Sequence, residues 1–137
     1  MQISFADLTH TPQVVSFFKN NLEHNNSAVY SEEFLCPLGI KGAIKRKQMI
    51  VAIFNGQVVG AFRFYRKKTT NTISLYQFAI SEIYRGQGVL KKMLKTINDL
   101  PIHALCPMES EFNEYFYKSG WHLQEHNPEF NMWVFND

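Results

Sequence analysis

The sequence predicts a mixed α/β fold, in which a central sheet of six or seven strands is flanked by about four helices. Two kinds of apolar pattern carry this prediction. Alternating or continuous apolar runs predict strands over 3–5, 49–54, 57–65, 73–80 and 102–106. Apolar residues at helical spacing predict helices over 14–22 and 89–100. A chain of 137 residues with 45% hydrophobic content is long enough to bury a core in one domain.

The first third of the chain is predicted to form one strand followed by helices. Thr11-Pro12 is typical of a helix start, with the Thr11 hydroxyl as the N-cap and Pro12 at the first helical position. Ser31 is expected to cap a short helix over 32–35, and Pro37 to end it. A weaker helical pattern covers 38–44.

The middle of the chain predicts three antiparallel strands and a helix. Asn55-Gly56 is predicted to form the turn between the first two strands. A two-residue hairpin turn requires positive φ at both positions, and Asn-Gly is the pair that favours it. Thr69-Thr70-Asn71 turns the chain into the third strand, 73–80. From Gly88 the apolar spacing becomes helical, and Pro101 marks the end of that helix.

The last third predicts a strand, a short helix and one or two closing strands. The strand covers 102–106, and the helix covers 112–118. Gly120 after Ser119 is typical of a helix end. The aromatic segment 121–136 is expected to form the closing strands around Asn127-Pro128.

Basic residues are concentrated in the middle of the chain. Residues 41–95 hold twelve Lys and Arg against one acid, a net charge of +11, and the remainder carries −9. A polyanion, either a phosphorylated cofactor or a nucleic acid, is a candidate partner if this segregation survives folding.

Composition also restricts the compartment and the class of site. The apolar runs are too short to cross a bilayer, and the first ten residues lack the basic region of a signal peptide. Cys36 and Cys106 lack metal-ligand spacing and are expected to be free thiols in a reducing cytoplasm. His122 and His126 lie four apart in a predicted strand, too far to chelate one ion, so no metal site is expected.

The segment ISEIYRGQGVLKKML, residues 80–94, carries the strongest functional signal. It predicts a strand end, a tight turn over 85–88 and an amphipathic helix. Glycines let the backbone approach a ligand closely, and the amides of a helix's first turn favour an anion such as a pyrophosphate. The segment is not a P-loop, because no Gly-Lys-Ser or Gly-Lys-Thr ends the glycine-rich stretch. It is not a dinucleotide fingerprint either, because Lys91 occupies the third glycine position. An ordinary strand-to-helix turn is the alternative.

The same segment resembles the acetyl-CoA signature of the GNAT superfamily of N-acetyltransferases. The core of that signature is Gln or Arg, two variable residues, Gly, one variable residue, then Gly or Ala. It falls on Arg85, Gly88 and Leu90, and Leu90 departs from it because a small residue is usual there. The upstream strand LYQFAI resembles the family's fourth strand.

The resemblance implies one GNAT-like acyltransferase domain over residues 1–137, with acetyl-CoA as cosubstrate. Backbone groups around Phe78 and Ile80 would then bind the pantetheine and the acetyl carbonyl. The pyrophosphate would lie on the loop formed by Arg85, Gly86, Gln87, Gly88, Val89 and Leu90.

A second segment, EYFYKSGW at 114–121, resembles the family's helix that ends in Phe-Tyr-x-Lys-x-Gly-Phe. Tyr117 takes the position of the tyrosine that often protonates the departing CoA thiolate; the alternative is a core tyrosine with a satisfied hydroxyl. Relatives often carry Asn seven residues earlier and Ala four residues earlier, where this chain has Ser110 and Asn113. Ser110 or Asn113 is therefore implied as a hydrogen-bonding partner of the cofactor.

These resemblances imply an N-acetyltransferase that moves an acetyl group to a primary amine by direct attack in a ternary complex. The acceptor is expected to be a small-molecule or peptide amine, and the aromatic C-terminal strands could pair two copies as a homodimer. Glu33, Glu82 and Glu109 are candidate bases, with ordered water as the alternative.

Two other functions stay open. One is a GNAT-like module that binds acyl-CoA without turnover. The other, ranked well behind, is a nucleic-acid surface over 41–68, although no known nucleic-acid motif is present. No membrane partner is expected.

Overall fold

The computed structural model describes residues 1–21 and 36–136 of the chain. Within them, seven strands are hydrogen-bonded in the order β1-β2-β3-β4-β5-β7-β6. The elements are β1 (Gln2–Phe5), η1 (Leu8–His10), α1 (Thr11–Asn21), α2 (Pro37–Lys45), β2 (Met49–Phe54), β3 (Gln57–Lys67), β4 (Thr72–Ile80), η2 (Glu82–Tyr84), α3 (Val89–Leu94), β5 (Ile102–Pro107), α4 (Phe112–Lys118), β6 (His122–His126) and β7 (Phe130–Phe135). The predicted class, a mixed sheet with four α-helices, is confirmed. The helix expected over 32–35 lies outside the described residues.

The chain divides into two compact units. Unit 1 comprises Met1–Phe64 and Gln77–Thr96, and unit 2 comprises Tyr65–Tyr76 and Ile97–Asp137. The single domain expected over 1–137 stays a prediction. No helix in the part of the chain that the structure describes is long and apolar enough to cross a membrane.

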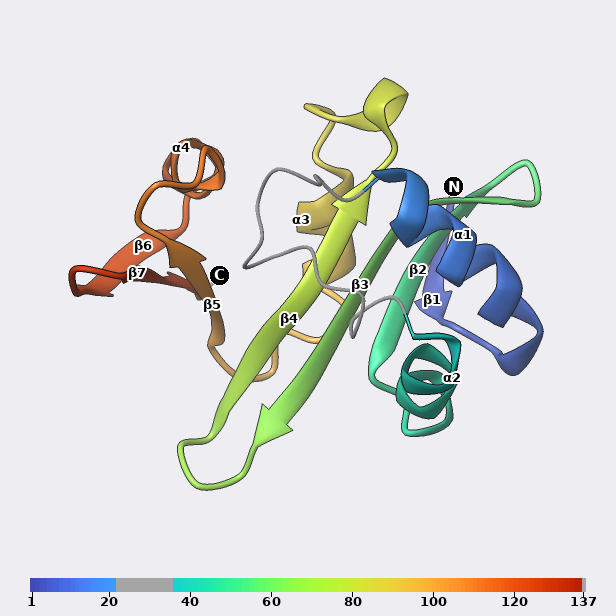
Figure 1. The fold of residues 1–137 in the computed structure, drawn as a ribbon, viewed down its shortest axis with the longest axis horizontal. Coiled ribbons are helices and arrows are strands. Elements are labelled where there is room, and N and C mark those ends of the chain that lie inside the picture. Colours follow the sequence, from blue (N-terminus) through green and yellow to red (C-terminus); the bar gives the residue numbers. More distant parts are fainter. Residues whose placement is uncertain (22–35, 137) are drawn as a thin grey trace. The chain divides into compact units, whose positions relative to one another are not determined.

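Unit 1 is a layered structure built on β1, β2 and β3 (Figure 1). These strands are antiparallel, with Ile3 opposite Ala52 and Ala52 opposite Gly60. Helices α1 and α2 bury one side of the strands in a shared cluster made of Ala6, Val14, Phe17, Phe18, Ile40, Ala43, Ile44, Met49, Val51, Ala61 and Ala79. Successive strand residues point to opposite faces, so Gly60 faces away from its neighbour Ala61, and Met93 of α3 lies there.

The first hairpin of unit 1 forms as predicted. Asn55 and Gly56 have φ of 51° and 76°, so both turn positions are left-handed. In unit 2 the second turn contains Asn71, whose φ is 53°. Asn tolerates this conformation because its short polar side chain bonds locally, and both turns therefore occur where the sequence placed them.

The start of the first helix differs from the prediction. Asp7, rather than Thr11, is the capping residue: its Oδ1 accepts hydrogen bonds of 2.7 Å from the backbone N and the hydroxyl of Thr9. These bonds lower the pKa of Asp7. Asp7 caps η1, and η1 continues directly into α1, so Thr11 is already helical and its hydroxyl donates to the carbonyl of Leu8.

The third helix is shorter than predicted. It ends at Leu94, because the hydroxyl of Thr96 donates to the carbonyl of Met93 at 2.6 Å and competes with further helical bonds. Ile97 is nevertheless buried, with 2% of its surface exposed. The apolar pattern therefore predicted correctly that Ile97 is buried, but this residue lies beyond the end of the helix.

Unit 2 contains three antiparallel strands in the order β5-β7-β6, and α4 contacts β5 and β6. In β7, Trp133 lies opposite Ala104 of β5 and Leu123 of β6. The ring of Phe116 in α4 stacks on Trp133 at 5.9 Å and meets Trp121 edge-on at 4.9 Å. Large aromatic side chains supply most of the burial here, as the aromatic composition of this segment suggested.

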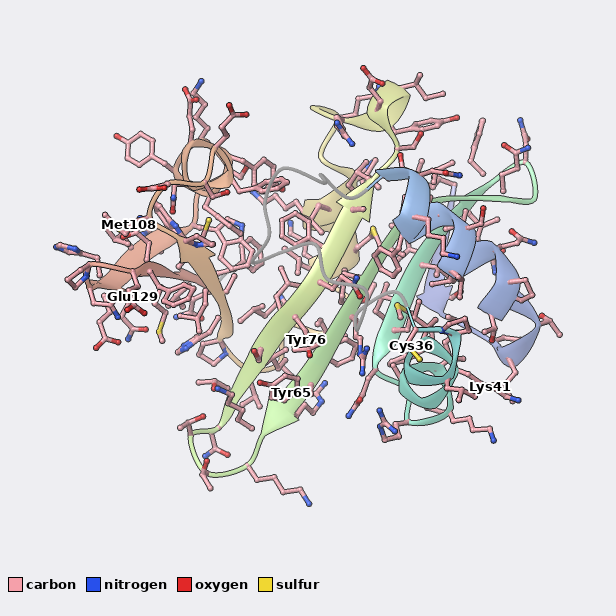
Figure 2. All side chains as sticks on the ribbon, viewed as in Figure 1. Cys36, Lys41, Tyr65, Tyr76, Met108 and Glu129 are labelled. Carbon is pink, nitrogen blue, oxygen red and sulfur yellow. The ribbon has the colours of Figure 1, made fainter. Side chains whose placement is uncertain are left out.

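The start of β4 joins this unit through a parallel pairing. Ile73 and Ser74 lie opposite Ile102 and His103 of β5. On the adjoining hairpin, the rings of Tyr65 and Tyr76 meet edge-on at 5.9 Å (Figure 2). The parallel pair makes the sheet mixed, because the other strand pairs with a given register are antiparallel.

Candidate functional site

The loop between β4 and α3 is the first candidate region and lies within unit 1. The backbone leaves β4 at Ile80, forms one turn of η2 and reaches α3 through residues 85–88. The ring of Tyr84 in η2 packs edge-on against Phe54 of β2 at 5.8 Å. This contact fixes the base of the loop on the strands.

Gly86 and Gly88 give the loop its conformation. Their φ values are 76° and 75°, a region that residues with a side chain adopt only at a cost of about 1–2 kcal/mol. A Cβ atom placed on either glycine would meet no atom of the described part of the chain within 4 Å. The backbone of residues 86–88 is therefore open to a ligand, and bare backbone of this kind suits a pyrophosphate.

Two side chains of the loop stabilise it by hydrogen bonds to backbone carbonyls earlier in the chain. The Nε of Arg85 donates to the carbonyl of Ile80 at 2.9 Å, and the Nε2 of Gln87 donates to the carbonyl of Ile83 at 3.0 Å. Within the described residues, Nη1 and Nη2 of Arg85 make no hydrogen bond. Arg85 is thus held in place by one nitrogen while two donors stay available to an anion.

The two residues after Gly88 point into the protein. Val89 and Leu90 are 6% and 4% exposed and belong to the buried side of α3. The bulk of Leu90, which departs from the family pattern, is therefore taken up by the core of unit 1. Their part in the site is limited to their backbone amides. The exposed side of α3 carries Lys91 and Lys92.

Phe78 and Ile80 lie at the end of β4 with their side chains half-buried. Ala79 between them packs into the α1–α2 cluster, so their side chains point to the other face of the strand. The carbonyl of Ile80 is the acceptor for Arg85. The structure thus brings Phe78, Ile80 and the loop 85–90 together in unit 1.

The other candidate residues lie on or next to α4, which belongs to unit 2. Tyr117 is 75% exposed and makes no hydrogen bond within the described residues. The alternative of a core tyrosine with a satisfied hydroxyl is therefore wrong. The core aromatic residue of α4 is the neighbouring Phe116, which is 2% exposed.

Asn113, on the first turn of α4, has hydrogen-bond partners at both the nitrogen and the oxygen of its side-chain amide. Its Nδ2 donates to the carbonyls of Pro107, Ser110 and Met108 at 2.8, 3.0 and 3.3 Å. Its Oδ1 accepts from Asn131 and Trp133 of β7, both at 2.9 Å. A bond from Asn113 to a cofactor would have to replace one of these.

Ser110 precedes α4 and supports its start. Its Oγ accepts a hydrogen bond of 3.1 Å from the backbone N of Phe112. It also bonds the thiol of buried Cys106, although burial is the larger influence and raises the pKa of that thiol. Cys106 is therefore an uncharged core group.

The candidate bases remain unassigned. Glu82 on η2 and Glu109 before α4 are both exposed, and Glu33 lies outside the described residues. Among the residues that the structure describes, no three His, Cys, Asp or Glu side chains gather in a group that could hold a metal.

Sequence reasoning missed the residues that support the site. Asn131 belongs to the inward-facing set of β7 with Trp133 and Phe135, and a polar residue in such a set requires a partner. That partner is Asn113. Gly60 was also missed. A glycine within a predicted strand is the one sequence signal of close packing there, and it does not indicate that the partners are Ile80 and Met93.

Comparison with known folds identifies closely similar structures. A PaiA N-acetyltransferase from Thermoplasma acidophilum, in complex with coenzyme A, has 13% identity and a TM-score of 0.78, with 99% of this chain and 98% of that chain covered. A diaminobutyrate acetyltransferase from Paenibacillus lautus, with L-2,4-diaminobutyric acid and coenzyme A, has 16% identity and a TM-score of 0.67, with coverage of 99% and 96%.

A third similar structure is an acetyltransferase from Salmonella typhimurium that modifies the N-terminal serine of a 50S ribosomal subunit protein. It has 15% identity and a TM-score of 0.72, with 98% of this chain and 94% of that chain covered. A search of curated protein sequences gives no match. The family model for "Acetyltransferase (GNAT) family" matches residues 18–121, which is most of the chain. This match covers the β4–α3 loop and α4, and the chain belongs to the GNAT acetyltransferase family.

Proposed function

We propose that this protein transfers an acetyl group from acetyl-CoA to a primary amine by direct attack in a ternary complex. The single observation that carries the proposal is the pair of left-handed glycines, Gly86 and Gly88, open to solvent within the segment that matches the GNAT family. Coenzyme A or acetyl-CoA is present in structures of similar fold, which supports this donor.

The described residues fit the pyrophosphate of such a donor. The backbone of 86–88 is accessible, and within the described residues Nη1 and Nη2 of Arg85 donate to no other group. Lys91 and Lys92 add positive charge on the exposed side of α3. Since α3 has only six residues, we assign most of the anion binding to the loop and to Arg85 rather than to the helix dipole.

Acetyl-CoA supplies an acetyl group activated as a thioester. The acceptor nitrogen forms a bond to the acetyl carbon, the carbon–sulfur bond breaks, and its electron pair stays on sulfur. The hydroxyl of Tyr117 donates its proton to that thiolate and is reprotonated from solvent. Ordered water removes the proton that the ammonium of the acceptor must lose. A backbone amide at the end of β4 stabilises the developing oxyanion.

The donor is tested by calorimetric titration of acetyl-CoA into matched glycine variants. Gly88→Glu places a charged side chain at the proposed pyrophosphate site and should weaken binding at least a hundredfold. Gly56→Glu is the control: Gly56 has φ of 76° and open space around its Cβ, so backbone strain and added charge are the same at a different turn of unit 1. Equal affinity in the two variants would contradict the loop assignment.

The acceptor is tested by thiol release from acetyl-CoA with a panel of primary amines. The panel contains spermidine, L-lysine, an aminoglycoside and a peptide with a free N-terminus. Release above the rate with water identifies the acceptor class. Tight binding of acetyl-CoA without release from any amine would favour the alternative, a module that binds acyl-CoA without turnover.

A further inference from the structure

We propose that Asn113 is a positioning residue, which holds α4 in the orientation that presents the hydroxyl of Tyr117. The proposal rests on the proposed function, because it assigns Asn113 its effect through Tyr117. It gives Asn113 a role other than the cofactor contact that its position in the motif implied.

The hydrogen bonds of Asn113 connect three separate segments of unit 2. Its Nδ2 lies within 2.8–3.3 Å of the carbonyls of Pro107, the last residue of β5, and of Met108 and Ser110 in the turn that follows. Its Oδ1 receives one hydrogen bond from Asn131 and one from Trp133, two positions apart on β7. One amide therefore fastens the start of α4 to a turn and to a strand at the same time.

Both of these partners are themselves fixed. The turn is joined to the start of β7, because the backbone N of Met108 donates to the carbonyl of Glu129 at 3.0 Å (both labelled in Figure 2). Asn131 is only 9% exposed and Trp133 only 5%. Since buried polar groups are costly to leave unpaired, the network has one low-energy arrangement.

Helix α4 depends on few anchors because it has seven residues. Its middle is held by Phe116, whose ring stacks on Trp133 and meets Trp121. Phe116 is the buried residue of this helix, and contacts at one buried side chain leave a short helix free to turn about it. Asn113, one turn earlier, supplies a hydrogen-bonded anchor at a different position, and together they fix the direction in which Tyr117 projects.

Trp133 belongs to both anchors. Its indole Nε1 donates to Asn113, and its ring stacks on Phe116 with an interplanar angle of 21°. The contacts that Asn113 and Phe116 of α4 make with β7 are therefore coupled through one side chain. Loss of the amide should turn α4 about Phe116 and move Tyr117, and misplacement by about 1 Å can cost as much as a hundredfold in rate.

The proposal is tested by a double-mutant cycle between Asn113→Ala and Tyr117→Phe. The measurement is thiol release from saturating acetyl-CoA with water as the acceptor, so no amine has to be identified. We expect Asn113→Ala to lower this rate about tenfold or more in the parent protein. In the Tyr117→Phe background the same change should lower it less than twofold, because the group that it positions is absent.

Asn127→Ala is the matched control. Asn127 also holds a turn in unit 2, with Oδ1 accepting from the backbone N of Glu129 and Phe130 at 2.8 Å, but its side chain makes no hydrogen bond to α4 among the described residues. We expect no difference between its effects in the two backgrounds. Trp133→Phe, which keeps the stacking and removes the N–H donor, repeats the test if Asn113→Ala does not fold.

Three results would overturn the proposal, and they are distinguishable. Equal losses from Asn113→Ala in the two backgrounds would show a structural effect that does not act through Tyr117. An unchanged rate in Asn113→Ala would show that the amide is dispensable. An unchanged rate in Tyr117→Phe alone would remove the proposed acid, and this inference would fail together with that part of the proposed function.

Discussion

A Cβ atom on Gly60 of β3 would lie 3.1 Å from the Sδ of Met93 in α3. It would also lie 3.0 Å from Cδ1 of Ile80, the last residue of β4. The absence of a side chain at Gly60 thus lets two elements pack directly on β3. These are the helix that follows the glycine loop and the strand end that precedes it.

We expect Gly60→Val to lower the free energy of unfolding by about 1–3 kcal/mol, the usual cost of overpacking a dense core. The change should also weaken acetyl-CoA binding, because both ends of the loop are displaced. Urea denaturation and calorimetry measure the two effects. Combining it with Met93→Ala should cost less than the sum of the single changes, since the space vacated by Met93 accepts the new methyl groups. Additive losses of stability would show that the contact with Met93 is not what excludes a side chain at Gly60.

Arg85 is expected to contribute to donor affinity through its guanidinium. Arg85→Ala removes the bond to the carbonyl of Ile80 and both free donors, and a hydrogen bond to a charged group is worth about 1.5–3 kcal/mol. Affinity should therefore fall about tenfold or more, and equally for acetyl-CoA and dephospho-CoA, which share the pyrophosphate. Calorimetry with both ligands tests this. Arg66→Ala is the control, because Arg66 instead pairs with Asp99 in unit 2 at 2.7 Å. A loss confined to acetyl-CoA would place Arg85 on the 3′-phosphate.

The strands and turns could be predicted because their signals are local. Asn55-Gly56 requires a left-handed pair whatever surrounds it, and the observed φ values are 51° and 76°. The alternation of β7 likewise predicts which residues face inward. By contrast, the end of α3 depends on one side-chain hydrogen bond of Thr96, which the spacing of apolar residues cannot predict.

The candidate site could be predicted where it depends on backbone conformation and not where it depends on partners. Gly86 and Gly88 were predicted because glycines in a strand-to-helix turn let a ligand approach the backbone closely and because the segment resembles the GNAT signature. The structure adds that both glycines have positive φ. The role of Asn113 depends on Asn131 and Trp133, which are 18 and 20 residues away along the chain. Nothing in the local pattern around Asn113 indicates that its amide faces a strand rather than a ligand.

Tyr117→Phe should separate binding from catalysis. Tyr117 is 75% exposed, so loss of its hydroxyl should leave both folding and acetyl-CoA affinity nearly unchanged. The rate at saturating acetyl-CoA should fall about a hundredfold or more, the typical contribution of a positioned general acid. Stopped assays of thiol release measure the rate, and calorimetry measures the affinity. Tyr115→Phe, on the same helix, should retain the rate; a similar loss in both variants would indicate damage to α4 instead of loss of an acid.

The stability of the protein should depend on pH through His103 in β5. Burial, and secondarily the positive charge of Lys67, lower the pKa of His103 below its ordinary value of 6.5. The folded protein therefore favours the neutral imidazole, and the unfolded chain binds more protons in the pH window just below 6.5. His103 should accordingly stabilise the fold above that window and lose this contribution as the pH falls through it. Urea denaturation at a series of pH values should give a shallower pH dependence of unfolding free energy in His103→Gln than in the parent protein. Lys67→Gln should reduce the pH dependence less than His103→Gln does, because burial is the larger cause of the lowered pKa and persists in that variant. An identical pH dependence in His103→Gln and the parent protein would contradict this assignment.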